Sequence, residues 1–356
     1  MLDRSIGLPA KYIQGPGALD RIGAVAVKLG STALVIADEF VLNLVGERIV
    51  NSLEVEGIRH EITKFNGECC RSEIDRLSAL ASSSNLGTII AVGGGKVLDT
   101  GKAVAAAING KIISAPTVAS TDGPTSSIAV EYSEDHVHIG VMRFNQSPSV
   151  VLVDSTVISQ APPRLLVAGM GDALATWFEG RACSKAGRTN FAGDAISDVS
   201  LTLARACHDT IMTYGRSALA AVQQQTVTEA LEKVIEANIF LSGVGFENTG
   251  VAAAHALDTA ISRFTSDHRA QHGERVAVGV LFQLILEGAE EDLELLLPFY
   301  NDVGLPKTLT DVGLTDLSDD ELTRLTNLLL RENSPIRNLP FEVTSVAIFK
   351  ALKRLQ

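Results

Sequence analysis

Two histidines and one aspartate carry the strongest chemical signal in this sequence. His255 stands in the alanine-rich stretch GVAAAHALDTA, His272 directly precedes GERVAVGV, and Asp172 lies in AGMGDALATWFEG. Two imidazoles and one carboxylate form a ligand set for Zn²⁺ or Fe²⁺, and three protein ligands leave a coordination position open for a substrate. The residue types therefore point to a catalytic metal site.

Each of these residues also has an ordinary structural explanation. A single histidine is more often a hydrogen-bonded core or surface residue than a metal ligand. An aspartate that follows Gly169 and Gly171 can be the N-cap of a helix. His268 and His272, four residues apart, are a second possible pair on a helix. Spacing alone does not choose among these interpretations.

A glycine-rich stretch, AVGGGKVLDTGKAVA, places Gly93, Gly94 and Gly95 between an apolar run and a helical pattern. At the carboxyl end of a strand, glycines let backbone N–H groups approach a phosphate, and the next helix N-terminus favours negative charge. The stretch matches neither the GxGxxG fingerprint nor a P-loop, so a tight turn is an equally good interpretation. For Asp99 and Lys102, an ordinary i,i+3 surface pair is an equally good interpretation.

Two further features are expected at the same edge of the sheet. Asp38 ends the run TALVIAD, where a carboxylate accepts from ribose hydroxyls and repels a 2′-phosphate, although an acidic turn residue is the plainer alternative. The segment PTVASTDGPTSS, which contains Asp122, is dense in hydroxyls that can bind a polyhydroxylated ligand or a nicotinamide, or can form a turn without a ligand. Glycines and Asp38 together favour NAD.

These residues need a sheet and helices to position them. Buried strands are expected at residues 32–38, 58–65, 87–95, 111–117 and 149–154, with helical patterns between them. This βαβ order predicts an α/β fold with a doubly wound, largely parallel, Rossmann-like sheet. Residues 126–144 match two strands around a polar turn, which is an antiparallel excursion.

A change of pattern follows Pro162 and Pro163, where a 3.6-residue periodicity takes over, as in EALEKVIEANIFLSGVG. We therefore expect an α/β nucleotide-binding domain over residues 1–162, a carboxyl-terminal all-helical metal-binding domain over residues 163–356, and a cleft between them.

Bulk composition limits the partners. A formal charge of -12 and a pI near 5.1 argue against nucleic acid or an anionic membrane surface, because both attract positive faces. The sequence shows no membrane-span pattern and no signal-peptide pattern, so we expect a cytoplasmic protein. The four cysteines lack metal-ligand or disulfide spacing, and we expect reduced thiols.

Six ordered motifs resemble one family. GGGKVLDTGKA, PTVASTDGPTSS, GMGDALATWFEG, FLSGVGFE, AAAHALDTA and QHGERVAVG are similar to segments of the glycerol dehydrogenases of the iron-containing alcohol dehydrogenase superfamily. The resemblance implies an NAD-binding domain and a divalent metal, usually zinc, held by Asp172, His255 and His272. It also implies that Asp122 faces the substrate. The residues that it suggests for the cofactor site are Asp38, Gly94, Gly95, Lys96, Val97, Leu98, Asp99, Thr117, Val118, Ala119, Ser120, Ser126, Ile128 and Tyr132.

Two positions depart from the family pattern. Members often carry a second histidine where this chain has Asp258, and many have alanine in place of Gly123. We expect metal binding to survive both changes and substrate preference to be the property they affect.

The expected reaction is oxidation of a vicinal diol such as glycerol to a hydroxyketone, with a metal ion as Lewis acid and hydride transfer to NAD. A related dehydrogenase for a 2-hydroxy acid or a glycerol phosphate is the first alternative; its substrate would need a cation, for which Arg181, Arg263 and Arg275 are candidates. A cyclising lyase of the dehydroquinate synthase type and a catalytically silent binding protein are further alternatives. Apolar helical faces such as LFQLILEGAEEDLELLLPFY also suggest a homo-oligomer.

Overall fold

A computed structural model describes residues 2–265 and 269–356 of the chain. These residues form two compact units. The sheet unit comprises Gly7–Ala161 and Ala221–Glu232, and the helical unit comprises residues 2–6, Pro162–Ala220 and Lys233–Gln356. The main boundary lies at Pro162, next to the expected one. Two short segments differ from the sequence-based division: residues 2–6 belong to the helical unit, and residues 221–232 belong to the sheet unit.

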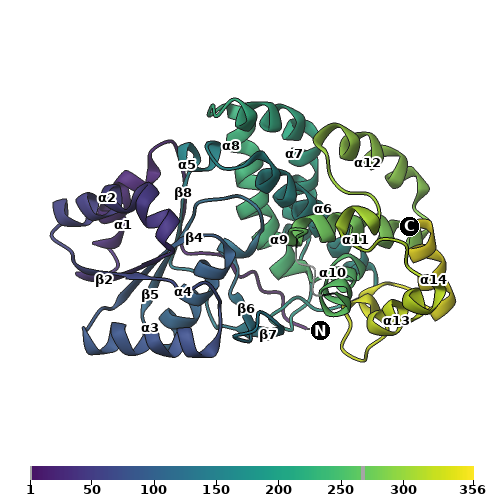
Figure 1. Cartoon of the computed structure of the whole chain (residues 1–356), viewed down its shortest axis with the longest axis horizontal. Coiled ribbons are helices and arrows are strands. Elements are labelled where there is room, and N and C mark those ends of the chain that lie inside the picture. The colour runs from purple at the N-terminus through teal and green to yellow at the C-terminus, as the bar shows by residue number, and fades with distance from the viewer. Residues whose placement is uncertain (1, 266–268) are drawn as a thin grey trace. The chain divides into compact units, whose positions relative to one another are not determined.

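A six-stranded parallel sheet forms the centre of the sheet unit (Figure 1). Its order is β1-β8-β5-β4-β2-β3, and every pair in it is parallel. The strands are β1 (Tyr12–Gly15), β2 (Thr32–Ala37), β3 (Arg59–Lys64), β4 (Thr88–Gly93), β5 (Lys111–Pro116) and β8 (Val150–Asp154). The five predicted strands are confirmed to within two residues. The short β1, with only four residues, was not predicted.

Helices cover both faces of this sheet because the strand side chains alternate between them. Val35 and Ala37 belong to one buried cluster, and Leu34 and Ile36 belong to another. Figure 1 shows α1 and α2 on one side of the sheet and α3 on the other. The helices of the unit are η1 (Ala18–Arg21), α1 (Ile22–Ala26), α2 (Glu39–Val55), α3 (Arg71–Ser83), α4 (Gly95–Ala107), η2 (Gly123–Thr125) and α5 (Ser155–Ser159). The predicted doubly wound arrangement is confirmed.

The predicted antiparallel excursion is also present. β6 (Ile128–Tyr132) pairs with β7 (His138–Arg143) in an antiparallel two-stranded sheet that is separate from the main one. It continues the hydroxyl-rich segment that follows β5.

The rest of the described chain is helical, as its periodicity predicts. Its elements are α6 (Pro163–Lys185), α7 (Asp198–Gln223), α8 (Glu229–Glu236), the π-helical η3 (Ala237–Leu241), α9 (Ser242–Thr249), α10 (Ala253–Phe264), α11 (His272–Glu287), α12 (Glu290–Val303), η4 (Thr310–Val312), α13 (Asp319–Leu329), η5 (Pro335–Asn338) and α14 (Ser345–Arg354). Pro163 starts α6, where the missing N–H costs no hydrogen bond. Across the described residues, none of the helices is both long and apolar enough to span a membrane.

Candidate metal centre and nucleotide-binding edge

Asp172 lies in the interior of a helix. α6 begins at Pro163, so Asp172 is in its third turn, and its side chain is 0 % exposed. The alternative that Asp172 is an N-cap is therefore wrong. A carboxylate buried this deeply in a helix needs positively charged or hydrogen-bonding partners.

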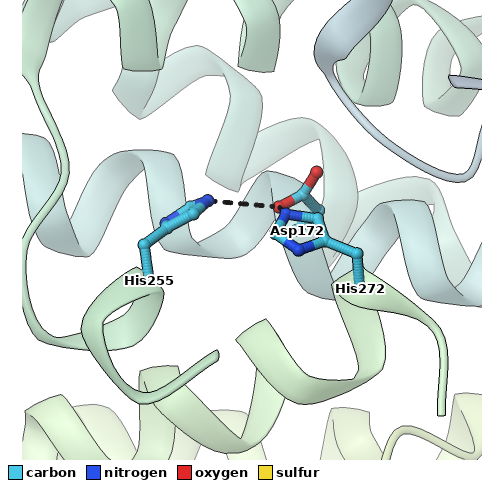
Figure 2. A group of neighbouring side chains, drawn as sticks. All are labelled: Asp172, His255 and His272. Carbon is cyan, nitrogen blue, oxygen red and sulfur yellow. Dashed lines mark ion pairs between the residues drawn. The ribbon is translucent and has the colours of Figure 1, made fainter. Parts of the chain in front are cut away.

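Two histidines from other helices provide these partners. His255 lies in the first turn of α10, and His272 is the first residue of α11. Their Nε2 atoms lie 3.6 Å and 3.3 Å from Oδ1 of Asp172. Figure 2 shows the three side chains gathered together. The three sequence-predicted ligands, far apart in the chain, therefore meet at one point.

The spacing of these atoms fits a tetrahedral metal ion. Ligand atoms about 2.1 Å from such an ion lie about 3.4 Å from one another. The two distances to Oδ1 fall within 0.2 Å of that separation, and all three ligand atoms lie within 4.8 Å of one another. At 3.6 Å, the His255 pair is also too long for a good hydrogen bond. The donor set fits Zn²⁺ or Fe²⁺.

Two glycines allow the helices to come close enough for this convergence. A Cβ on Gly273 would lie 1.9 Å from the carbonyl oxygen of Ala168, and one on Gly171 would lie 2.4 Å from the carbonyl oxygen of Gly273. Only glycine fits at such contacts between α6 and α11. The glycine that follows His272 is thus explained by helix packing, which brings His272 beside Asp172.

A carboxylate faces the other nitrogen of each imidazole. Nδ1 of His255 lies 2.6 Å from Glu179 Oε2, and Nδ1 of His272 lies 3.1 Å from Asp258 Oδ2. Glu179 also accepts from the N–H groups of Ala252 and His255, so it caps the start of α10. A carboxylate on Nδ1 fixes the tautomer and directs the Nε2 lone pair toward a metal.

The electrostatics of the centre favour a cation. Burial disfavours the charged form of His255, but the charge and hydrogen bond of Glu179 outweigh it and raise the pKa of His255 to about 9. Burial likewise opposes ionisation of Asp258, but the charges of His272 and Arg275 hold the pKa of Asp258 well below its usual range. Both imidazoles lose any added proton when they bind a metal, and the carboxylates of Asp172, Glu179 and Asp258 then outnumber Arg275, so the ion would enter a centre with net negative charge.

The alternative pair of His268 and His272 cannot be compared with this set, because His268 lies outside the described residues.

In the sheet unit, the predicted nucleotide residues gather where the strand order reverses. From β2 the chain steps outward to β3 and then returns to β4 on the other side of β2. Ile36 pairs with Ala91, so Asp38 and Gly93 both follow at the carboxyl ends of neighbouring strands. This reversal is the position at which open α/β sheets bind ligands.

The start of α4 is suited to a phosphate. Gly93 has a φ of 151°, which disfavours any side chain, and Gly94 is the N-cap. The backbone amide of Leu98 donates to Gly94, so the amides of Gly95, Lys96 and Val97 precede the helical ladder. The side chains of Val97 and Leu98 belong to the hydrophobic core. These two residues can therefore contact a cofactor only through their backbone groups.

Asp38 is the N-cap of α2. Its Oδ1 accepts from the N–H of Val41 at 2.9 Å, so Asp38 has a local structural role at the start of a helix, where a turn residue was the alternative. A carboxylate has two oxygens, and capping keeps its charge at the sheet edge, so this role does not conflict with ribose recognition.

Lys96 and Tyr132, two of the suggested cofactor residues, lie together. The ammonium of Lys96 is 5.1 Å from the centre of the Tyr132 ring and 2.6 Å from Oε2 of the buried Glu68. Glu68 also contacts His136. The start of α4 is thereby linked to the β6–β7 sheet.

Lys102 is not part of an ordinary surface pair. Its side chain is 3 % exposed, and its ammonium donates to Asp99 and to the carbonyl oxygens of Gly123 and Ile128 at 3.0, 2.7 and 2.6 Å. Asp99 in turn accepts from the N–H of Val130. Lys102 therefore holds the segment that contains the other predicted cofactor residues and the buried Asp122.

Substitution of Lys102 by methionine tests this role. The change leaves Asp99 and two carbonyl groups without their buried cation, and we expect a loss of about 3–5 kcal/mol in the free energy of unfolding, measured by urea titration. A matched control is Lys111→Met, at the exposed start of β5, which should shift stability by less than about 0.5 kcal/mol. Equal effects of the two changes would show that the contacts of Lys102 contribute little.

Gly123, one of the two departures, has room for a side chain. A Cβ there would lie 3.7 Å from Oγ1 of Thr121, an ordinary contact. Alanine would fit, so the departure at this position needs no steric explanation.

The three arginines considered for an anionic substrate are poorly suited to it. Arg181 pairs with Glu287 and Asp292, and Arg275 pairs with Asp258. Arg263 lies in the last turn of α10, about 12 Å along the helix axis from His255. Arg181 and Arg275 already have carboxylate partners within the helical unit.

Sequence reasoning missed Glu179, and it named Asp258 only as a departure from the family pattern, without its contact with a histidine. Glu179 is seven residues after Asp172, which places both on one face of α6, and Asp258 is three residues after His255 on α10. Helical spacing from a predicted ligand would have identified both as neighbours. The contact of Asp258 with His272, on another helix, has no such signal.

The sequence and fold are similar to those of known proteins. Residues 9–155 match the family described as iron-containing alcohol dehydrogenase. A glycerol dehydrogenase of Pseudomonas putida is 42 % identical over 99 % of this chain and 96 % of its own, and one of Citrobacter freundii is 41 % identical over 97 % and 94 %. The crystal structure of a probable glycerol dehydrogenase from Sinorhizobium meliloti 1021 has a TM-score of 0.93 and 38 % identity, covering 99 % of this chain and 98 % of its own.

Proposed function

Because the chain belongs to the iron-containing alcohol dehydrogenase family, we propose that it oxidises a vicinal diol such as glycerol to a hydroxyketone with NAD. Convergence of Asp172, His255 and His272 is the observation that carries this proposal. When bound there, a divalent metal supplies Lewis acidity to an alcohol group, and NAD supplies the hydride acceptor. We propose Zn²⁺ as the ion, with Fe²⁺ as the alternative, because both suit imidazole and carboxylate ligands.

The protein residues have separate roles in this proposal. Asp172 and the two histidines hold the metal, and Glu179 orients His255 through its ring and its backbone N–H. Both imidazoles are partly exposed, with 34 % for His272 and 18 % for His255 against 0 % for Asp172, which supports approach of the substrate from the imidazole side.

The sheet unit would bind NAD. The amides at the start of α4 face the pyrophosphate, Asp38 accepts from the adenosine ribose, and the segment from Thr117 to Tyr132 contacts the nicotinamide half. Support comes from the position of these residues at the reversal of strand order. Asp122, buried in that segment, is the proposed partner of a second substrate hydroxyl.

A diol is favoured over a 2-hydroxy acid or a glycerol phosphate. An anionic substrate needs a cation that is not already neutralised. Arg181 and Arg275 both have carboxylate partners, and Arg263 lies at the far end of α10 from His255. A neutral polyol requires no such cation.

We also propose a cytoplasmic homo-oligomer. All four cysteines are free and buried, as suits a reducing compartment. α12 exposes the apolar side chains of Leu295 and Leu297, and exposed apolar side chains are typical of surfaces at which subunits meet. Light scattering of the purified chain measures its oligomeric state.

Metal analysis with a substrate panel tests the proposed function. Protein purified without added metal should contain bound Zn²⁺ or Fe²⁺, and its initial rates of NADH formation should be higher on glycerol and 1,2-propanediol than on 2-hydroxybutyrate. Removal of the ion by a chelator should abolish all three rates, and its return should restore them.

Other outcomes identify the rival functions. Faster oxidation of 2-hydroxybutyrate would favour the hydroxy-acid dehydrogenase. Turnover without net NADH would favour a cyclising lyase, and a chain without bound metal or turnover would be a silent binding protein.

A further inference from the structure

A second carboxylate on α10 joins two helices at the metal centre. Asp258 has 11 % of its side chain exposed and uses both oxygens. Oδ2 lies 3.1 Å from Nδ1 of His272, and Oδ1 accepts from Nε of Arg275 at 2.6 Å. Arg275 also donates to the carbonyl oxygen of Ala270, just before α11. Two residues of α11 therefore contact Asp258: Arg275 fixes its position, and His272 is the first residue of the helix.

His272 needs such a partner more than His255 does. His255 lies within α10, and Glu179 binds both its ring and its backbone N–H. His272 is the first residue of α11 and is more exposed than His255. Of its two ring nitrogens, Nε2 faces Asp172 and Nδ1 faces Asp258. With the Nδ1 proton directed at Asp258, the Nε2 lone pair points to the ion.

We propose that Asp258, itself held by Arg275, is a positioning residue that sets the tautomer and direction of His272 for metal binding. This inference rests on the proposed function, because it requires that the chain binds a divalent ion. It also gives the departure at position 258 a purpose other than substrate preference: this chain has a carboxylate where it can complete a carboxylate–histidine–metal arrangement on each imidazole.

Asp258→Asn is the direct test. An amide presents only one acceptor oxygen, so its NH₂ group must face either Arg275 or His272, both of which are donors. We expect the dissociation constant for Zn²⁺, measured on the full chain by competition with a chromogenic chelator, to rise 10–100-fold. Glu179→Gln should give a loss of similar size through His255.

Asp292→Asn is the matched control. Asp292 also pairs with an arginine, at 2.8 Å from Arg181, but the pair does not include a metal-site histidine. Its Zn²⁺ affinity should stay within about twofold of the parent chain, although Arg181 also loses a carboxylate partner. Equal Zn²⁺ affinity in the Asp258 and Asp292 variants would overturn the proposal and leave Asp258 as a structural contact.

A second variant covers failure of the first to fold. Arg275→Gln keeps the acceptor of His272 but removes the cation that holds it, so we expect a smaller, severalfold loss of Zn²⁺ affinity; an unchanged affinity would contradict the role given to Arg275. If the parent chain itself binds no Zn²⁺ or Fe²⁺, the proposed function fails. If the parent chain binds the metal and Asp258→Asn binds it equally tightly, only this inference is refuted.

Discussion

His272→Ala is expected to lose the bound metal and nearly all turnover while the chain still folds. The change leaves only two of the three proposed ligands, Asp172 and His255. Lewis acidity stabilises developing charge by several kcal/mol, so kcat/KM on glycerol should fall by at least about 10³-fold. His272 is partly exposed at the first position of α11, where the capping box of Gln271 and Glu274 still starts the helix. Elemental analysis, initial rates and circular dichroism measure the three properties.

His60→Ala provides the comparison. His60 is a histidine of β3, near the amino end of that strand and therefore at the edge of the sheet opposite to the nucleotide residues. The metal content and rates of this variant should match those of the parent chain. Full activity of metal-free His272→Ala would refute the assignment of the centre.

The three proposed metal ligands could be singled out by residue type, but their spacing does not show that they meet. Asp172, His255 and His272 come from three helices, and nothing in their sequence separation indicates that they meet. Their meeting depends on close helix packing at Gly171 and Gly273. Glycines before an aspartate are typical of a helix start, whereas here Gly171 lies inside α6 and allows α11 to contact it.

The parallel sheet was predictable because its strands are buried on both faces and appear as continuous apolar runs. β1 was missed because its four residues, YIQG, are only partly buried and give no such run. The alternative that Lys102 belongs to a surface pair was wrong for a different reason. Its partners include the carbonyl oxygens of Gly123 and Ile128, and backbone acceptors have no sequence signature.

NAD should be preferred over NADP, and this preference should depend on the charge of Asp38. A 2′-phosphate about 5 Å from a carboxylate is disfavoured by about 3 kcal/mol at an effective dielectric constant of 20, which is a discrimination of roughly 10²-fold. Because Asp38 also caps α2, alanine at this position would mix the loss of charge with a loss of about 1 kcal/mol in stability. Serine separates the two effects, since its hydroxyl can cap the helix without a charge.

Asp38→Ser should therefore lower the ratio of kcat/KM for NAD to that for NADP by about 10²-fold and keep the thermal stability of the parent, whereas Asp38→Ala should lower both. Glu39→Gln is the control, because it removes the adjacent charge, which Lys64 already neutralises at 2.5 Å; its cofactor ratio should change less than about twofold. Parent enzyme that uses NADP as well as NAD, or a ratio unaltered in Asp38→Ser, would show that the carboxylate serves α2 alone and that cofactor choice is made by other residues at the sheet edge.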